Sequence, residues 1–312
     1  MRITIQTQPL VLRFGAKKAY RMIQEAGFEA VDWGLDLAWN SNVVKAAKEF
    51  HDLCIFEKGI DAALEHYAEE LACMQENRLA ITQAHAPGPA FVKDGYALME
   101  YAIGIYREMI RFCQRISCGK LIIHGVSLSL GNYITAEECE QLNDHLFESL
   151  ISVLQETDVK VCIENVWMAA GDRGNYDIYS GQFTDPREAR EMVDRLNEKA
   201  GKECFGICLD TGHLHMTRNR FSDYIPAVGK RILALHIHDN MQNYDSHLMP
   251  YAGSIRWNEF LQALHDVGYD QDLNFETCGM FGAPRMPEEL VPSFLRTIYK
   301  EGVFFRDKIQ GK

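Results

Sequence analysis

The chain has 312 residues, of which 47% are hydrophobic and 24% charged, and these values are typical of a globular protein with a sizeable core. The formal net charge of −12 argues against a nucleic-acid partner, because proteins that bind DNA or RNA usually present a basic face. We expect no membrane span, since no apolar run approaches about 18 residues. We also expect no signal peptide in the opening "MRITIQTQPL".

Nine cysteines are scattered along the chain, and none falls in a CxxC pair. Cys162, Cys208 and Cys278 lie inside apolar stretches, so we expect them to be small buried hydrophobes in a reducing compartment. A cytoplasmic location follows as an expectation.

Eight short β-rich stretches alternate with segments of helical character. The β-rich stretches are ITIQTQ (3–8), AVDWGLD (30–36), ITQAHAP (81–87), LIIHGVS (121–127), VKVCIENV (159–166), FGICLDTGH (205–213), ILALHIHDN (232–240) and DLNFETCG (272–279). The clearest helical segments are 16–28, 135–157, 184–201, 256–269 and 286–302. Thr135 and Glu138 form a capping-box pattern at the start of the second of these, and Pro186 and Gly201 are suited to the start and stop of the third.

This alternation predicts an α/β protein built from parallel βαβ units. Eight units without a linker predict one (β/α)₈ TIM barrel that occupies residues 1–312 as a single domain. A doubly wound open sheet is the alternative, although no GxGxxG follows the first strand. Two segments, about 37–60 and 167–185, are longer than ordinary connections. We expect extended loops there, and the second is either a lid or wall of the active site or an insertion without a role.

Polar residues gather at the carboxyl ends of the predicted strands, which meet at one mouth in a barrel. They are His85, His124, Glu164, Asp210, His213, His236, His238, Asp239 and Glu276, with Asp245 and His247 in the loop after the seventh strand. A single histidine at such a place is more often a hydrogen-bonded core residue than a ligand. Repetition on six successive strands favours a divalent-metal site instead.

Strand geometry indicates which of these side chains point to the same face. Successive strand residues point to opposite sides, so His236 and His238 share a face and could both point inward. His213 and His215 lie beyond the strand, where this rule fails, and His215 could be plain loop. We expect structural or surface roles for the four histidines in helical or loop contexts, His51, His66, His145 and His265.

The motifs "IQEAGFEAVD", "AHAP", "IHG", "IEN", "LDTGH", "HIHD", "DSHLMPYAG" and "FET", in this order, resemble the xylose isomerase-like TIM-barrel superfamily. This superfamily includes sugar phosphate isomerases and epimerases, such as the tagatose epimerase group, and the related endonuclease-four type AP endonucleases. The resemblance covers nearly the whole chain, although each motif alone is weak.

In the epimerase branch, the resemblance implies one divalent ion held by Glu164, Asp210, His236 and Glu276. The ion would be Mn²⁺, with Zn²⁺, Co²⁺ or Mg²⁺ as alternatives. Glu164 and Glu276 would also be the catalytic acid and base, acting through a metal-stabilised enediolate. The implied function is a metal-dependent isomerase or epimerase of a sugar, sugar phosphate or sugar acid, in carbohydrate metabolism.

The endonuclease-four branch adds ligands for a three-zinc cluster. They correspond to His85, His124, His213, Asp245 and His247, which in a sugar enzyme would instead bind substrate. A multi-zinc phosphodiesterase therefore stays an alternative, as does a dehydratase or lyase acting on an inositol or keto-sugar. A further alternative is a metal-binding barrel without catalysis. The presence of both Glu164 and Glu276 argues against it.

Two departures from the epimerase pattern concern substrate binding. The stretch "DNMQNYDSH" lacks the Arg that ketose epimerases carry shortly after the histidine of the seventh strand, here His236. The stretch "NVWMAAGD" lacks the second Glu that they carry after the fifth strand. Trp33, Trp167 and Trp257 could stack on a sugar or pack in the core. Arg218, Arg256 and Arg285 could bind a phosphate. We expect a small sugar substrate and a possible homo-oligomer.

Overall fold

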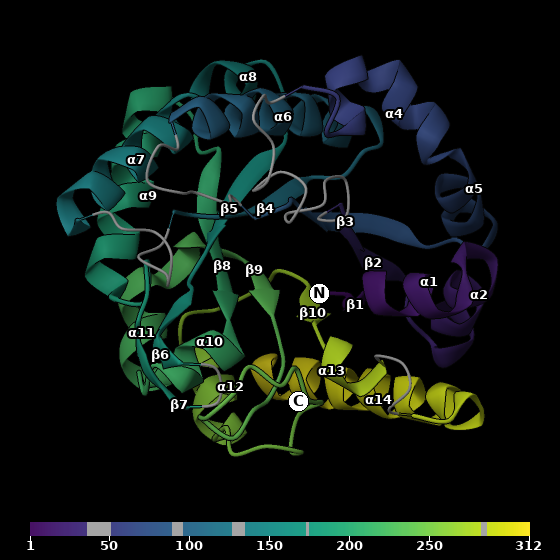
Figure 1. Ribbon diagram of the computed structural model, residues 1–312. Helices are drawn as coiled ribbons and strands as arrows, with labels where there is room; N and C mark the ends of the chain where they lie inside the picture. Colours follow the sequence, from purple (N-terminus) through teal and green to yellow (C-terminus); the bar gives the residue numbers. More distant parts are fainter. Residues whose placement is uncertain (36–50, 89–95, 127–134, 173–174, 282–285) are drawn as a thin grey trace.

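Eight parallel strands form a nearly closed barrel in the computed structural model, with helices around it (Figure 1). The structure describes residues 1–35, 51–88, 96–126, 135–172, 175–281 and 286–312. The barrel strands are β1 (Ile3–Gln6), β2 (Ala30–Gly34), β3 (Ala80–His85), β4 (Lys120–His124), β5 (Lys160–Glu164), β8 (Phe205–Asp210), β9 (Ile232–His236) and β10 (Leu273–Phe275). Each lies within a predicted β-rich stretch or starts one residue before it, so the predicted (β/α)₈ barrel is confirmed.

The barrel closes between β9 and β10, the two ends of the sheet order β10-β1-β2-β3-β4-β5-β8-β9. In the described part of the chain this seam consists of one isolated bridge, Ile237 to Phe275. The Ile237 N–H donates to the Asn274 carbonyl at 2.8 Å, and the Glu276 N–H donates to the Ile237 carbonyl at 3.0 Å. The seam is therefore the shortest strand pairing in the described part of the barrel.

The helices bury their apolar sides against the outside of the barrel. Those of the outer layer are α2 (Ala16–Ala26), α4 (Ile60–His66), α5 (Ala68–Glu76), α6 (Tyr96–Arg115), α7 (Ala136–Glu148), α8 (Ile151–Gln155), α9 (Pro186–Ala200), α11 (Phe221–Val228), α12 (Trp257–Asp266) and α14 (Val291–Ile309). The Thr135 capping box is present, and α9 ends at Gly201 in the left-handed conformation that favours glycine.

Two predicted helices have different bounds in the structure. The segment 135–157 divides into α7 and α8 because the Ser149 carbonyl accepts two hydrogen bonds from Arg107, at 3.0 and 2.7 Å. That carbonyl is no longer free to accept from the helix, which breaks there. The segment 286–302 is preceded by a 3₁₀ turn, η4 (Glu288–Leu290), and the helix proper extends to Ile309.

The segment 167–185 is more regular than the loop we expected. Strands β6 (Trp167–Asp172) and β7 (Asn175–Ser180) pair in antiparallel fashion as a hairpin. Gly181 closes its base, where an added Cβ would lie 2.1 Å from the Val166 carbonyl oxygen. Of the other long segment, residues 36–50 lie outside the described part of the chain, and 51–60 include η2 (Ile55–Lys58).

Short helices also follow strands at the mouth. These are α1 (Gln8–Phe14) after β1, α10 (Thr211–Met216) after β8 and α13 (Cys278–Phe281) after β10. No helix in the described ranges is long and apolar enough to cross a membrane. The cysteines other than Cys278 are buried free thiols, and Cys162 and Cys208 pack with Ile122 and Ala234 in a small apolar cluster.

Helix α14 packs closely on the first and last barrel strands through Gly302. A Cβ at this position would lie 2.4 Å from Ile3 Cγ2 and 2.9 Å from Phe275 Cε2, whereas one at Gly104 in α6 would meet nothing within 4 Å. We therefore expect Gly302→Ala to lower the free energy of unfolding by about 1–3 kcal/mol through overpacking. Gly104→Ala should raise it by up to about 1 kcal/mol through helix propensity. Urea unfolding of both variants checks this, and equal effects would contradict it.

Candidate metal centre

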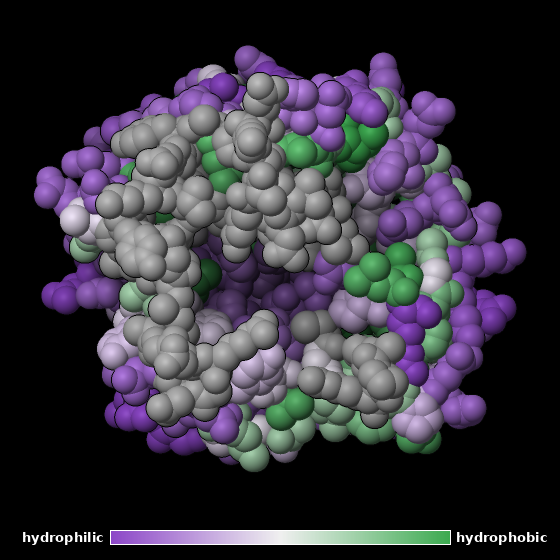
Figure 2. All heavy atoms as spheres, in the orientation of Figure 1, coloured by the Kyte–Doolittle hydropathy of each residue, from purple (hydrophilic) through white to green (hydrophobic). Residues whose placement is uncertain are grey.

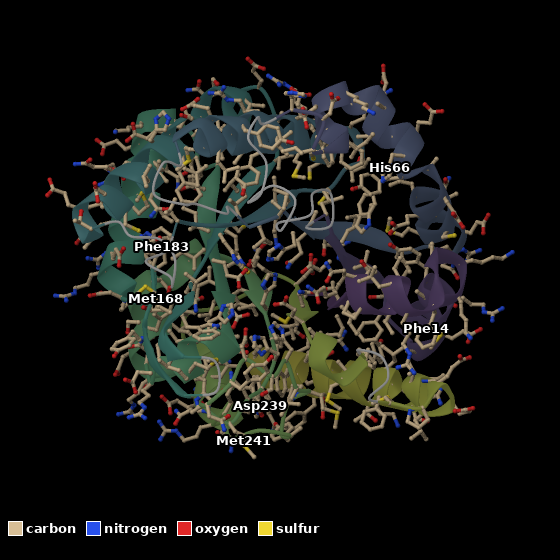
Figure 3. All side chains as sticks on the ribbon, viewed as in Figure 1. Phe14, His66, Met168, Phe183, Asp239 and Met241 are labelled. Carbon is tan, nitrogen blue, oxygen red and sulfur yellow. The ribbon has the colours of Figure 1, made fainter. Side chains whose placement is uncertain are left out.

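A hollow lined by hydrophilic residues opens at the centre of the barrel mouth (Figure 2). The nine predicted site residues are all described, and the structure brings them together at this mouth. They are His85 on β3, His124 on β4, Glu164 on β5, Asp210 on β8, His213 on α10, His236 on β9, Asp245 and His247 on the loop after β9, and Glu276 after β10. Figure 3 labels Asp239 and Met241 at the start of that loop.

Two glutamates face the same nitrogen of His236. The Nδ1 atom lies 3.0 Å from Glu164 Oε2 and 3.1 Å from Glu276 Oε2. Asp210 completes the group, since one ligand atom from each of these residues and Asp210 lies within 4.8 Å of the others. All four side chains are buried, so four potential ligands from four elements converge on one point away from bulk water.

The spacing of this group fits a shared metal ion. Ligand atoms bound at about 2.1 Å to one ion would lie roughly 3.0–3.4 Å apart for angles between octahedral and tetrahedral. The two distances at His236 Nδ1 agree with this range. Moreover, Nδ1 makes no hydrogen bond in the described residues, although two carboxylate oxygens adjoin it. A buried nitrogen in this position needs a partner, and a cation between the three atoms would supply one.

Asp210 is held by backbone and side-chain contacts. Its Oδ1 accepts the His213 N–H at 2.6 Å, which caps α10. His238 Nε2 lies 3.0 Å from both Asp210 oxygens. The His238 ring in turn lies against Gly212, where a Cβ would come within 1.9 Å of His238 Cε1. The turn "DTGH" therefore needs its glycine so that the imidazole can approach the carboxylate.

Glu164 has a second group of neighbours on the other side of the mouth. Its Oε2 lies 3.1 Å from His124 Nε2 and 3.4 Å from His85 Nε2. The Nδ1 of His85 lies 2.8 Å from the Ala86 carbonyl. A carbonyl only accepts, so Nδ1 carries the proton and the Nε2 lone pair of a neutral His85 faces Glu164. Glu164 could thus be shared between two ions.

A third group, formed by His213, His247 and Asp245, has a similar arrangement of imidazole nitrogens around a carboxylate. His213 Nε2 and His247 Nε2 both lie 3.1 Å from Asp245 Oδ2. The Nδ1 atoms donate to backbone carbonyls, His213 to Asn165 at 3.0 Å and His247 to Glu276 at 3.1 Å. If both rings are neutral, two lone pairs face one carboxylate, which is unfavourable without protons or a cation between them.

Burial and neighbouring charges shift the pKa values of these groups in opposite directions. Burial opposes ionisation of Glu164, but His236, with His124 and His213, holds the pKa of this carboxyl well below its usual range. Burial would lower the pKa of His213, but Asp210 and Asp245 raise it well above 6.5. The pKa of Asp245 is likewise well below its usual range because His213 and His247 outweigh its burial.

Several residues at the centre were missing from the predicted set. Asp32 on β2 lies 3.2 Å from His236 Nε2, and Gln6 Nε2 donates to Glu276 Oε1 at 2.9 Å. His238 was considered as inward-facing but not assigned a role. An acid inside the apolar stretch "AVDWG" was the available signal for Asp32, because a buried strand rarely holds an unpaired carboxylate.

The other aromatic and basic candidates lie away from the centre or outside the described residues. Trp33 and Trp257 are buried, and their indole N–H groups donate to Glu70 and Asp239. Arg218 and Arg256 are exposed and line a separate cavity of about 330 Å³ with His215. Trp167 starts β6 and is partly buried, whereas Arg285 lies outside the described residues.

A family model described as "Xylose isomerase-like TIM barrel" matches residues 21–296. The uncharacterized protein y4fM of Sinorhizobium fredii is 23% identical over 268 residues, which cover 84% of this chain and 81% of that protein.

Two solved structures share the fold. D-psicose 3-epimerase with D-tagatose, from Clostridium cellulolyticum H10, is 15% identical with a TM-score of 0.68 and covers 98% of this chain and 99% of that one. The IOLI protein with a zinc atom is also 15% identical with a TM-score of 0.68, and 99% of each chain is covered. At this identity the likeness concerns the fold.

The opposed pKa shifts predict a stability maximum for the metal-free protein. Glu164, Asp210 and Asp245 have lowered folded pKa values, so their contribution is complete above about 4.5 and is lost as the pH falls. His213 and His236 have raised folded pKa values, so their contribution is complete below 6.5 and is lost as the pH rises. We expect the highest Tm in chelator between these values.

Thermal unfolding from pH 4 to pH 9 in chelator and in excess Zn²⁺ measures this. Bound metal replaces the imidazole protons, so the optimum should move to higher pH when the ion is present. A metal-free Tm that keeps rising above pH 7 would contradict the assignment of these ion pairs.

Proposed function

The chain belongs to the xylose isomerase-like TIM-barrel family, and from this premise we propose that it is a divalent-metal-dependent isomerase or epimerase acting on a sugar or sugar derivative. The observation that carries the proposal is the pair of glutamates, Glu164 and Glu276, that face one nitrogen of His236 from opposite sides of the barrel seam. The psicose 3-epimerase that shares the fold, with D-tagatose in its structure, supports a sugar as the substrate class.

Glu164, Asp210, His236 and Glu276 would hold the ion. Three carboxylates and one imidazole are a hard, mostly oxygen ligand set that suits Mn²⁺, Zn²⁺, Co²⁺ or Mg²⁺. The zinc atom in the IOLI protein of the same fold supports a metal in this barrel type. A bound divalent ion would act as a Lewis acid toward a sugar carbonyl and its neighbouring hydroxyl.

The two glutamates would move the proton. Glu164 stays ionised because of its imidazole neighbours, with its pKa well below the usual range, so it can accept a proton from the carbon next to a carbonyl. Glu276 is oriented by Gln6 and retains a small exposed fraction of 7%. Return of the proton to the opposite face would give epimerisation, and its return to the adjacent carbon would give isomerisation.

The remaining polar side chains would recognise the substrate. His213 and His247 hold Nε2 toward Asp245 at the mouth, and His85 and His124 surround Glu164. These groups can bind sugar hydroxyls. Because the ketose epimerase Arg and second Glu are missing from "DNMQNYDSH" and "NVWMAAGD", we propose a substrate other than a simple free ketose bound in the epimerase manner.

Substitution of the glutamates tests the mechanism. Glu164→Gln and Glu276→Gln keep the side-chain shape but remove the proton acceptor, so each should lower kcat by about 10²–10⁴. The exposed Glu198→Gln on α9 is the matched control and should keep full activity. The assay is a panel of ketoses, keto-sugars and keto-acids with Mn²⁺, Co²⁺ and Zn²⁺, together with deuterium exchange from solvent. Full activity of Glu164→Gln would refute the mechanism.

The two further imidazole groups favour a second candidate, a multi-zinc phosphodiesterase. The Nε2 atoms of His85, His213 and His247 face carboxylates, and an additional ion between nitrogen and oxygen would stabilise each such pair. The formal charge of −12 opposes a polyanionic substrate.

A third candidate function is a dehydratase or lyase that uses the same two glutamates on an inositol or keto-sugar.

Metal analysis separates the first two candidates. A sugar enzyme should retain about one ion per chain after dialysis and a nuclease-type cluster about three. Asp245→Asn should remove about one equivalent only if the group of His213, Asp245 and His247 holds an ion. Three tightly bound zinc ions, with cleavage of abasic DNA, would overturn the sugar proposal.

A further inference from the structure

Asp32 is a wholly buried carboxylate on β2, with no exposed surface. Its Oδ2 accepts hydrogen bonds from Gln83 Nε2 at 3.0 Å and from Asn274 Nδ2 at 2.8 Å, and it lies 3.2 Å from His236 Nε2. Its Oδ1 has no hydrogen-bond partner among the described residues. Burial of an incompletely paired carboxylate is costly, so this residue calls for a role beyond packing.

The position of Asp32 relative to His236 indicates that role. The imidazole stands between two sets of acids, with Nε2 toward Asp32 and Nδ1 toward Glu164 and Glu276. Asp32 therefore lies behind the ring, on the edge away from the two glutamates. It contacts the proposed metal ligand rather than the place where a substrate would bind.

We propose that Asp32 is a positioning residue, and this inference rests on the proposed function. Its carboxylate, 3.2 Å from His236 Nε2, would accept the Nε2–H after a small rotation of the ring, which would leave the lone pair on Nδ1 directed at Glu164 and Glu276. A carboxylate behind a metal-binding histidine fixes the tautomer and raises the basicity of the ligand nitrogen. Without this acid, the His236 proton could occupy either nitrogen.

The surroundings of Asp32 hold it in place for this purpose. Gln83 and Asn274 come from β3 and β10, and Asn274 Oδ1 accepts from Thr4 Oγ1 of β1 at 2.9 Å, which orients the amide toward Asp32. The Asp32–His236 pair has the distance of an ion pair but not the alignment of a hydrogen bond. Because two amides anchor the acid, a small rotation of the imidazole would complete the bond.

A metal-affinity measurement tests the inference without relying on activity. Asp32→Asn keeps the side-chain volume and a carbonyl acceptor but removes the charge. We expect its dissociation constant for Zn²⁺, from competition with a chromophoric chelator, to rise about 10–100-fold. The visible spectrum of the Co²⁺-loaded protein should also change, because the ligand nitrogen is altered.

Glu70→Gln is the matched control. Glu70 accepts hydrogen bonds from Tyr20 Oη at 2.7 Å and from Trp33 Nε1 at 3.0 Å, beside the opposite face of the same strand. Neither partner belongs to the proposed metal centre. Its affinity for Zn²⁺ should stay within about twofold of the wild type. Equal affinities in Asp32→Asn and the wild type would overturn the inference alone. Failure of the wild type to bind any divalent metal would overturn the proposed function and this inference with it.

A second measurement does not require the variant to fold. In wild-type protein with ¹⁵N-labelled histidine and bound Zn²⁺, the His236 resonances should show a protonated Nε2 and a metal-bound Nδ1. A protonated Nδ1, or an Nε2 bound to the ion, would overturn the positioning role of Asp32.

Discussion

Electrostatic repulsion among buried acids is the constraint on which this mouth depends. Parallel strands deliver Glu164, Asp210 and Glu276 to one small volume, and Asp245 and Asp32 adjoin it. Carboxylates at such distances cannot all stay ionised in a low-dielectric interior unless positive charge is interleaved with them. The imidazoles contribute that charge when protonated, and an ion can contribute it when they are neutral. The dense histidine pattern is therefore a requirement of the acid cluster, in addition to its proposed role as a ligand set.

Backbone carbonyls face one nitrogen of three imidazoles at this mouth. His85, His213 and His247 each place Nδ1 against a carbonyl, which belongs to Ala86, Asn165 or Glu276. His236 departs from this arrangement, because its Nε2 faces a carboxylate and its Nδ1 faces the glutamates. The proposed ligand His236 therefore has an acid beside the ring nitrogen that faces away from the two glutamates.

Much of the barrel could be predicted from the sequence because strand periodicity and helix caps are local properties. All eight strands and the Thr135 cap were found this way, and converging strand ends gathered the predicted site residues. The features that were not predicted depend on tertiary contacts. The break after α7 depends on Arg107, far along the chain, and the hairpin of β6 and β7 forms a separate two-stranded sheet within a glycine-containing segment. The inward direction of Asp32 accompanies a register shift between Val31 and Asp32, which simple alternation cannot reveal.

The short seam of the barrel would couple its closure to occupancy of the proposed metal site. His236 ends β9 and Glu276 follows β10, so the two proposed ligands stand on opposite sides of the shortest strand pair, where Ile237 and Phe275 form the bridge. An ion bound by both would cross-link β9 and β10, the two ends of the sheet order. Part of its binding free energy would then appear as resistance of the barrel to local opening. Amide hydrogen exchange along β9 and β10 would thus be governed by the chemistry at the mouth.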